Sequence, residues 1–238
     1  SVLSTSPLLY SQEAFAMKAI IFGSIGSVVE TSELQRSAFN ITFKQRGLNW
    51  HWSRPEYQAM LRSSGGENRI SEFAKLRGQT VDASGLHQTK SAIFQEILRK
   101  TPIEPRPGVI NLFENATSRG MKIGFATMTE SLTVSAIVSS LKSENGIVFN
   151  ASTSQENGFA PKPNSDVFDH VLKELVCDPW DVIAIEDNSD GVKAAKAAQI
   201  WTVGFPGANV SVDDLNHADL LAHNNINDAI PTHFLDAP

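Results

Sequence analysis

The stretch that most constrains the fold runs from Ala19 to Ser27 and reads AIIFGSIGS. Its first four residues are apolar without a break, which is typical of a strand buried on both faces of a parallel sheet. Glycines at positions 23 and 26 then interrupt the apolar pattern and predict a turn. Because ligand crevices in open α/β sheets lie beyond the carboxyl ends of the strands, we expect a site directly after Phe22.

From residue 109 onward the sequence alternates between helical and extended patterns. Helices are expected at 109–118, 131–141, 165–175 and 191–198, and strands at 122–126, 146–150, 181–185 and 201–205. Strands that alternate with helices form a parallel sheet covered by helices on both faces. The chain is therefore predicted to have an α/β fold in which residues 19–22 form one of the buried strands.

The first part of the chain has a different pattern after the opening strand, because it shows helical periodicity and no convincing strand up to residue 100. Helices are expected at 31–47, 54–61, 68–76 and 87–98. In the first of them Ser32 and Gln35 match a capping box, and Ile41 belongs to an apolar stripe.

A link rich in proline, at 101–108, marks the return from this helical segment to the alternating pattern. We therefore predict an α/β core at 17–30 and 106–238, with an inserted helical cap at 31–105. Residues 1–16 precede Met17 and are interpreted as an N-terminal extension, since they lack the features of a secretory signal.

The composition narrows the possible roles. The 20 basic and 26 acidic residues give a net charge of −6, with no long run of one sign, which disfavours binding to nucleic acid or to an anionic membrane. No apolar run approaches the ~20 residues that span a bilayer. Cys177 is the single cysteine, so an intrachain disulfide is excluded and a reducing compartment, the cytoplasm, is expected.

The turn after Phe22 resembles the first motif of the haloacid dehalogenase-like hydrolases, in which a strand ends in Asp-x-Asp-Gly-Thr. Gly26 and Ser27 stand for the Gly-Thr pair, whereas Gly23 and Ile25 stand where the family has its two aspartates. In the family the first aspartate attacks the phosphoryl group and the second acts as general acid and base. The resemblance implies a phosphatase fold, normally Mg²⁺-dependent, whose first motif here carries no carboxylate.

Three later motifs of that family can be matched at strand ends. Thr127 occupies the hydroxyl position that binds the phosphoryl group, and Lys162 matches the lysine that offsets its charge. Glu186 and Asp187 match the acidic pair that holds magnesium. Each also has an ordinary explanation, as a strand-end threonine, a lysine on a rigid loop and an acidic loop. Their common order along the chain is what favours the site.

Further stretches, at 30–40, 48–52, 65–70 and 106–109, are similar to the CbbY-like sugar-phosphate phosphatases, relatives of β-phosphoglucomutase. This likeness implies a Rossmann-type sheet, a four-helix cap of the C1 type and a sugar phosphate as ligand. It also implies that Gly65, Gly66 and Arg69 lie on the cap side of the site. Gln35 replaces a usual histidine. Glu67 replaces the lysine that follows the glycine pair in the phosphatase, and its negative charge would repel a second phosphate, so specificity for a bisphosphate is not expected.

The loss of both aspartates determines the functional hypothesis. Glycine offers no atom for attack and isoleucine cannot transfer a proton. A Mg²⁺ ion left to Glu186, Asp187 and the carbonyl of residue 25 should be held weakly. Ser24 and Ser27 are interpreted as turn residues, because the sequence places no base beside either hydroxyl.

Two hypotheses of different class follow. The first is a phospho-ligand-binding or regulatory protein with little or no phosphatase turnover, in which Thr127, Lys162, Arg69 and the backbone N–H groups after Gly23 hold the phosphate. Lys90 is a further candidate, although an exposed, solvated helix face is the default explanation for both Lys90 and Arg69. The second is an atypical hydrolase of small phosphate esters that uses a metal-activated water. A normal enzyme with engineered residues at 23 and 25 is a third and lesser one.

Overall fold

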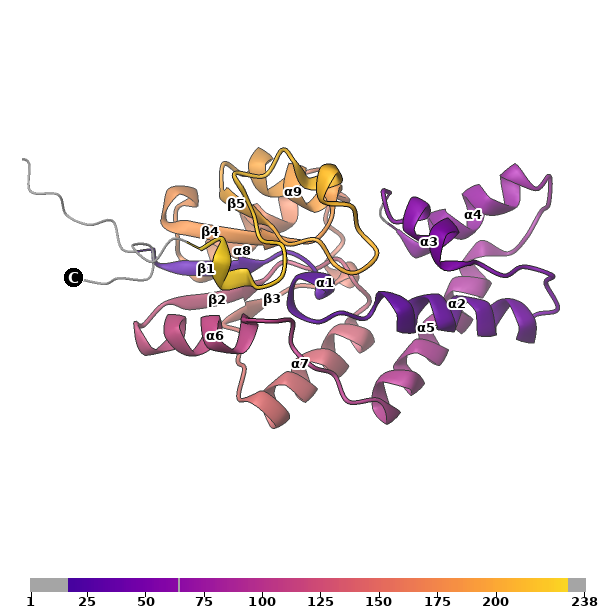
Figure 1. The fold of residues 1–238 in the computed structure, drawn as a ribbon, viewed down its shortest axis with the longest axis horizontal. Coiled ribbons are helices and arrows are strands. Elements are labelled where there is room, and N and C mark those ends of the chain that lie inside the picture. The colour runs from indigo at the N-terminus through magenta and orange to yellow at the C-terminus, as the bar shows by residue number, and fades with distance from the viewer. Residues whose placement is uncertain (1–16, 64, 231–238) are drawn as a thin grey trace, which may run out of the picture.

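A six-stranded parallel sheet forms the centre of the larger part of the molecule (Figure 1). The computed structural model describes residues 17–63 and 65–230, and its strand order is β3-β2-β1-β4-β5-β6. The strands are β1 (Ala19–Phe22), β2 (Lys122–Phe125), β3 (Ala151–Ser152), β4 (Val182–Glu186), β5 (Trp201–Gly204) and β6 (Leu220–Leu221). Because β1 pairs with β2 and β4, its carboxyl end opens at the middle of the sheet edge.

Alternate residues of β1 face two different helix layers. Ile20 and Phe22 belong to a cluster that includes residues of α6 (Val109–Ser118) and α7 (Ser131–Asn145). Ala19 and Ile21 pack instead with residues of α8 (Asp166–Leu175) and α9 (Ser189–Ala197). Burial on both faces explains the unbroken apolar run of this strand. The predicted α/β fold, with a parallel sheet covered by helices on both faces, is confirmed.

Four longer helices in the described part of residues 31–105 form the cap, which lies beyond one end of the sheet in Figure 1. They are α2 (Ser32–Gln45), α3 (Arg54–Met60), α4 (Gly66–Leu76) and α5 (Ala83–Lys100). Their apolar cluster is separate from those of the sheet and rich in aromatic rings, such as Phe39 and Trp52 with centroids 4.7 Å apart. The predicted helical insertion is confirmed. The domain limits at 31 and 105 stay a prediction, and the extension at 1–16 lies outside the described residues.

The strand predicted at 146–150 is wrong. Gly146 has a φ of 68° and ends α7, so the strand begins later, at Ala151. Ile147, an apolar residue that suggested a strand, packs into the core instead. The side chain of Asn150 accepts a hydrogen bond of 2.7 Å from the N–H of Ile123. This N–H would otherwise be free to bond to the backbone of a longer β3. β6 and the short helix α1 (Ile25–Val28) were not expected, because segments this short carry no periodicity.

The start of α2 also differs from the prediction. Thr31, and not Ser32, is the N-cap residue, and its hydroxyl accepts a hydrogen bond of 3.1 Å from the Gln35 side chain. The N–H of Ser32 donates to the Glu30 carboxylate. In the expected capping box, this N–H would instead donate to the Gln35 side chain. Ile41, assigned to the apolar stripe, is 38% exposed.

The two connections between cap and sheet lie side by side. Val29 and Pro105 form an antiparallel bridge, and the N–H of Arg106 donates to the carbonyl of Val28 at 2.8 Å. The buried Arg106 guanidinium donates to the carbonyls of Gly26, Phe205 and Pro206 at 2.6–2.8 Å. One side chain thus ties the loop after β1, the loop after β5 and the return from the cap together.

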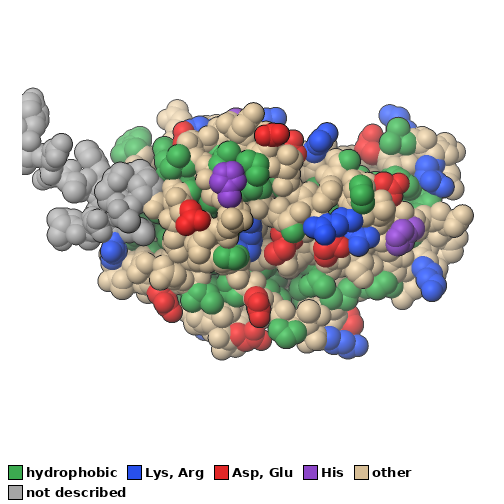
Figure 2. All heavy atoms as spheres, viewed as in Figure 1, with side chains coloured by type: hydrophobic (Ala, Val, Ile, Leu, Met, Phe, Trp, Pro, Cys, Tyr) green, Lys and Arg blue, Asp and Glu red, His purple; other side chains and the backbone are tan. Residues whose placement is uncertain are grey.

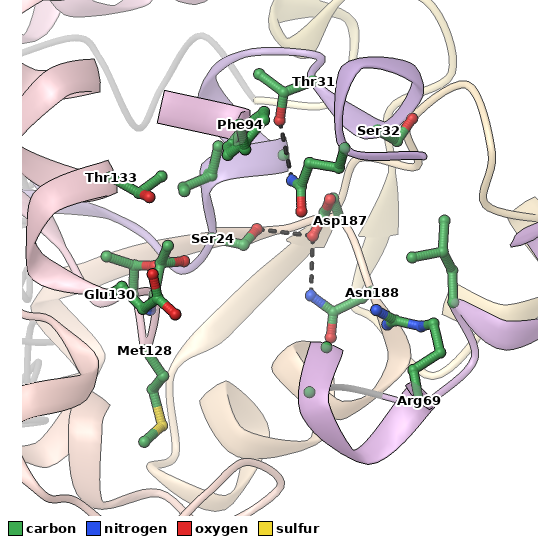
Figure 3. A pocket seen from close by; sticks show the side chains of 18 of the residues that line it. Ser24, Thr31, Ser32, Arg69, Phe94, Met128, Glu130, Thr133, Asp187 and Asn188 are labelled. Atoms are coloured by element: carbon green, nitrogen blue, oxygen red, sulfur yellow. Dashed lines mark hydrogen bonds between the residues drawn. The ribbon is translucent and has the colours of Figure 1, made fainter. Parts of the chain in front are cut away.

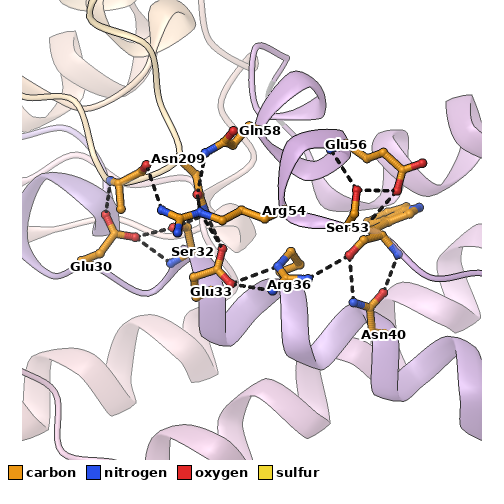
Figure 4. Close-up of polar contacts among 12 residues, drawn as sticks. Glu30, Ser32, Glu33, Arg36, Asn40, Ser53, Arg54, Glu56, Gln58 and Asn209 are labelled. Carbon is orange, nitrogen blue, oxygen red and sulfur yellow. Dashed lines mark hydrogen bonds and ion pairs between the residues drawn. The ribbon is translucent and has the colours of Figure 1, made fainter.

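A second contact between cap and core centres on Asn209, which is 3% exposed (Figure 4). Its side-chain oxygen accepts hydrogen bonds from Arg54 at 2.9 Å and from Gln58 at 3.2 Å. Its amide group donates to Ser32 at 3.0 Å and to Glu33 at 2.8 Å. A single core side chain therefore joins α2 and α3 to the loop that follows β5.

The surface carries charges of both signs. On the face shown in Figure 2, Lys and Arg side chains are interspersed with Asp and Glu. Within the ranges 17–63 and 65–230, no helix has the length and apolar character needed to cross a membrane.

Candidate functional site

A cavity of about 680 Å³ lies between the carboxyl edge of the sheet and the cap (Figure 3). We call this cavity the pocket. Its core side is lined by residues that follow β1, β2, β3 and β4, namely Ser24, Ile25, Gly26, Thr127, Lys162, Asp187 and Asn188. Its cap side is lined among others by Gln35, Tyr57, Gly65, Gly66, Glu67, Arg69, His87 and Lys90. Most of the residues singled out in the sequence therefore meet around one cavity, whereas Gly23 and Glu186 are not part of its lining.

Gly23 follows β1, and the Glu186 side chain occupies the space beside it. A Cβ atom added at Gly23 would lie 2.0 Å from Glu186 Oε1, and one added at Gly191 would lie 2.3 Å from the same atom. Such distances are far inside van der Waals contact, so the carboxylate fits only because both neighbours lack a side chain. Glu186 is 0% exposed. The space beside Gly23, the residue that the sequence analysis matched to the nucleophile, is thus filled by an acid from another strand.

Lys162 neutralises the buried Glu186 carboxylate. Its Nζ lies 2.7 Å from Glu186 Oε1 and also donates to the carbonyl of Gly23. The Lys162 side chain is only 9% exposed, so this is a buried ion pair. Burial raises the pKa of Glu186, and the Lys162 ammonium opposes that rise. Removing either charge would leave the other unpaired in the interior.

Asp187, the second member of the predicted acidic pair, lies in the pocket. Its Oδ1 accepts hydrogen bonds from the Ser24 hydroxyl at 2.7 Å and from the Asn188 amide at 2.8 Å (Figure 3). A Cβ added at Gly26 would lie 1.8 Å from Asp187 Oδ2, so that glycine is needed for the approach. Ser24 therefore has an acidic partner that the sequence did not place beside it. Ser27 fits its predicted turn role, since its hydroxyl donates to the carbonyl of Ser24 at 2.6 Å.

Ile25 and Thr127 complete the core side. Ile25 begins α1, packs into the main apolar cluster and has its carbonyl bonded to the N–H of Val29 at 2.9 Å. Thr127 is buried just after β2, and its hydroxyl donates to the Thr129 hydroxyl at 2.9 Å. Both residues line the pocket at the predicted positions. Neither offers a group that could accept a proton at neutral pH.

On the cap side, Arg69 is held by carbonyl oxygens. Its Nη2 donates to the carbonyl of Ser63 at 3.1 Å, and its guanidinium lies 5.6 Å from the centre of the Tyr57 ring. Gly65 is the N-cap residue of α4, with a φ of 94°. Gly66 leaves room for His87, whose Nε2 would lie 2.5 Å from a Cβ at that position. Within residues 17–63 and 65–230, Arg69 forms no ion pair with a carboxylate.

Lys90 is buried, which corrects the alternative that it lies on an exposed helix face. It is 6% exposed, and its Nζ donates to the Gln35 side chain at 3.2 Å and lies 4.6 Å from the centre of the Phe39 ring. Burial, together with the nearby Arg69 charge, lowers the pKa of Lys90 to about 7. Glu130 acts in the opposite direction. A sequence signal was available, because Lys90 stands four residues from both Leu86 and Phe94 on the buried face of α5.

Glu130 belongs to a neighbouring polar cluster at the start of α7. Its Oε1 accepts a hydrogen bond of 2.8 Å from the Ser91 hydroxyl and lies 3.4 Å from Nδ1 of His87. Burial lowers the pKa of His87, so the imidazole is neutral at neutral pH. The sequence analysis singled out neither residue, because their contact depends on the packing of α5 against α7.

The family implies a Mg²⁺ ion, and the side chains on the core side do not fit one. Mg²⁺ requires oxygen ligands in near-octahedral geometry. Of the predicted ligands, Glu186 is buried against Lys162, and the carbonyl of Ile25 is bonded within α1. Of these predicted ligands, only the Asp187 carboxylate remains available in the pocket. Among the described residues, no group of three or more His, Cys, Asp or Glu side chains is placed to hold a metal ion.

Comparison with known proteins identifies the family. A model of the family described as "Haloacid dehalogenase-like hydrolase" matches residues 20–205. The chain belongs to this family. It is 31% identical to Protein CbbY of Rhodobacter capsulatus, over 85% of this chain and 91% of that protein.

Solved structures agree with this assignment. The crystal structure of CbbY from Rhodobacter sphaeroides in complex with phosphate superposes with a TM-score of 0.77 at 30% identity, covering 87% of this chain and 93% of that one. An aspartate-to-asparagine variant of the same CbbY, in complex with xylulose-(1,5)bisphosphate, gives a TM-score of 0.76 with the same identity and coverage. The chain is thus a sugar-phosphate-phosphatase-like member of the family, and the predicted relationship to CbbY is confirmed.

Proposed function

We propose that this protein binds a small phosphorylated sugar in the pocket without hydrolysing it. The observation that carries the proposal is the Gly23–Glu186 arrangement, which leaves no side-chain oxygen on the residue after β1. Formation of an aspartyl phosphate needs such an oxygen in line with the phosphorus atom. The buried Glu186 cannot replace it, because its carboxylate is enclosed and paired with Lys162.

The cap side supports binding of the anion. Arg69 and Lys90 both line the pocket, and neither is ion-paired to a carboxylate among the described residues. A phosphate group would offer charge-assisted hydrogen bonds to both. The solved CbbY complexes with phosphate and with xylulose-(1,5)bisphosphate make a phosphorylated sugar the favoured ligand class. Glu67, which also lines the pocket, favours a ligand with a single phosphate.

The test combines binding with turnover. Sugar monophosphates and an aryl phosphate are titrated calorimetrically, and inorganic phosphate release is followed with and without Mg²⁺. We expect saturable binding of at least one sugar phosphate and no release above a protein-free control. The Gly23→Asp/Ile25→Asp variant, which restores both carboxylates, is assayed beside it, and we expect release from this variant. Release by the unmodified protein at a rate near that of the variant would refute the proposal.

One observation favours a second candidate, an atypical hydrolase with a serine nucleophile. The Ser24 hydroxyl lies in the pocket and donates to the Asp187 carboxylate, which Asn188 holds in place. A hydroxyl beside an oriented base is the arrangement of an activated nucleophile. In this scheme the Ser24 proton passes to Asp187 as Ser24 Oγ bonds to phosphorus, the P–O bond to the alcohol breaks, and Asp187 gives the proton to the departing alkoxide. Water then attacks the phosphoserine, one of its protons passes through Asp187 to Ser24 Oγ, and inorganic phosphate is released. Intact-mass measurement after incubation with an aryl phosphate distinguishes the candidates: a phosphorylated protein that is absent in Ser24→Ala supports the second.

A further inference from the structure

We propose that the Lys162–Glu186 ion pair has taken the place of the family's metal ion, so that this protein binds its phosphorylated ligand without a divalent cation. This inference rests on the proposed function, and it concerns how the core side of the pocket is held together. It starts from the disagreement between the magnesium that the family implies and the side chains present.

The first step is the space created by Gly23. With any side chain at that position, Glu186 Oε1 could not stay where it is, since even a Cβ would lie 2.0 Å away. Gly191 provides the other half of the enclosure, with its added Cβ 2.3 Å from both carboxylate oxygens. The Glu186 carboxylate therefore lies between two glycine backbones and outside the lining of the pocket. A metal ion shared with a ligand would have to lie inside the pocket.

The second step is the position of the Lys162 ammonium. It bonds to the Glu186 carboxylate and to the Gly23 carbonyl, so one cationic group joins the ends of β1 and β4. The ammonium also lies 5.1 Å from the centre of the Phe168 ring. A metal ion bound by acids at these strand ends would make the same connection with the same sign of charge. The charge that a cation would balance is already balanced by the protein.

The third step concerns Asp187, the acid left in the pocket. Its Oδ1 accepts hydrogen bonds from Ser24 and Asn188, both neutral donors. Mg²⁺ is usually bound by one or two carboxylates together with substrate phosphates, so in the unliganded protein a single carboxylate with neutral partners is a poor site for it. The cap supplies the positive charge that the ligand needs, through Arg69 and Lys90.

The test measures ligand and metal binding separately. The dissociation constant of a sugar phosphate is determined calorimetrically in excess Mg²⁺ and in excess EDTA, and Mn²⁺ binding to the unliganded protein is followed by electron paramagnetic resonance. For the unmodified protein we expect ligand affinities equal within about twofold and no saturable Mn²⁺ binding. Affinity at least about tenfold higher with Mg²⁺, or saturable Mn²⁺ binding, would overturn the inference.

Three variants at one position sharpen the result. Gly23→Asp must displace Glu186 and adds a carboxylate, so we expect saturable Mn²⁺ binding to appear. Gly23→Asn displaces Glu186 with a neutral side chain of nearly the same shape, and Gly23→Ala displaces it with the smallest one. We expect neither control to match Gly23→Asp in Mn²⁺ affinity. Equal Mn²⁺ binding by all three would show that Gly23 does not control metal affinity and would overturn the inference. Circular dichroism establishes that each variant is folded.

The measurements distinguish a failure of this inference from a failure of the proposed function. If no sugar phosphate binds under either condition, the proposed function fails, and the Mn²⁺ measurement still decides whether the ion pair excludes a metal. If a sugar phosphate binds only with Mg²⁺, the proposed function stands and the inference fails.

Discussion

The two sides of the pocket satisfy their charges differently. On the core side, Lys162 is paired with Glu186, and although Lys162 lines the cavity, the Glu186 carboxylate is buried outside its lining. On the cap side, Arg69 and Lys90 face the cavity with carbonyl, amide and aromatic partners and no ion-paired carboxylate among the described residues. The core side thus has its buried charges paired, whereas the cap side keeps cationic groups that, under the proposed function, bind an anionic ligand.

Under the proposed function, this difference explains how the family's fold can be kept without phosphatase chemistry. A catalytic carboxylate at position 23 would be held in place together with a metal and a lysine. Here the glycine lets a neighbouring acid fold back and neutralise the lysine, so no buried charge is left unpaired. In the proposed arrangement an internal ion pair joins the strand ends in place of a metal ion, while Arg69 and Lys90 on the cap stay available to a ligand.

The largest expected effect tests the paired state of the core side. We expect Lys162→Met to lower the free energy of unfolding by roughly 3–5 kcal/mol, because it leaves the Glu186 carboxylate buried and unpaired. The double variant Lys162→Met/Glu186→Gln should recover most of this loss, since it removes both charges. Urea unfolding at neutral pH measures both. Lys196→Met, which breaks the more exposed pair with Asp219, is the control and should cost about 1 kcal/mol or less. Equal costs at the two sites would contradict the buried pair.

The next effect tests the charge of the cap side. We expect Arg69→Met to weaken sugar-phosphate binding by about 10- to 100-fold, because a charge-assisted hydrogen bond to the phosphate is lost. Calorimetric titration measures the change. Arg77→Met is the matched control, since Arg77 follows the same helix and lies over the Phe73 ring but does not line the pocket. A similar loss in both variants would indicate a general electrostatic effect and no specific contact.

A smaller effect is expected from the protonation of Lys90. Its pKa of about 7 lies below the ordinary 10.5, so its ammonium loses a proton as the pH rises above neutrality. Phosphate monoesters are already dianionic in this range, so affinity should fall by up to about tenfold per pH unit above 7. Titrations across this range should show the slope, and Lys90→Met should flatten it. A slope unchanged in Lys90→Met would show that another group titrates.

The lowered pKa of Lys90 also determines how the free energy of unfolding should change with pH. Between about 7 and 10.5 the unfolded chain binds the Lys90 proton more tightly than the folded protein does. The contribution of Lys90 to the free energy of unfolding therefore increases with pH across that window. Lys90→Met should remove this part of the pH dependence, which urea unfolding at several pH values would show.

The smallest effect concerns the contact that joins the two sides. Asn209→Ala removes four hydrogen bonds between the core loop and α2 and α3. We expect dissociation of the bound sugar phosphate to become a few-fold faster, at about the scale of one net hydrogen bond, because the cap opens more readily. Stopped-flow displacement measures this rate. Asn216→Ala, in the same connection between β5 and β6 but outside the pocket lining, serves as the control.

Much of the fold could be predicted from the sequence, because the strand at 19–22 and the helices of the core carry clear apolar periodicity. The positions of Thr127, Lys162 and Asp187 at the pocket could also be predicted, since strand ends meet at one edge of a parallel sheet. The direction of the Glu186 side chain could not. It depends on space at Gly23 and Gly191, two residues far apart in sequence that only the folded sheet brings beside the same carboxylate.

The Val29–Pro105 bridge has a consequence for how such proteins diversify. Since the segment between these residues leaves and re-enters the sheet domain at neighbouring points, its removal would leave a gap that a short turn could close. The Arg106 side chain, which binds three carbonyls of the core, would keep that junction intact. The helical cap could therefore be exchanged as a unit between related proteins. Under the proposed function, ligand recognition would change with the cap while the sheet domain stayed the same.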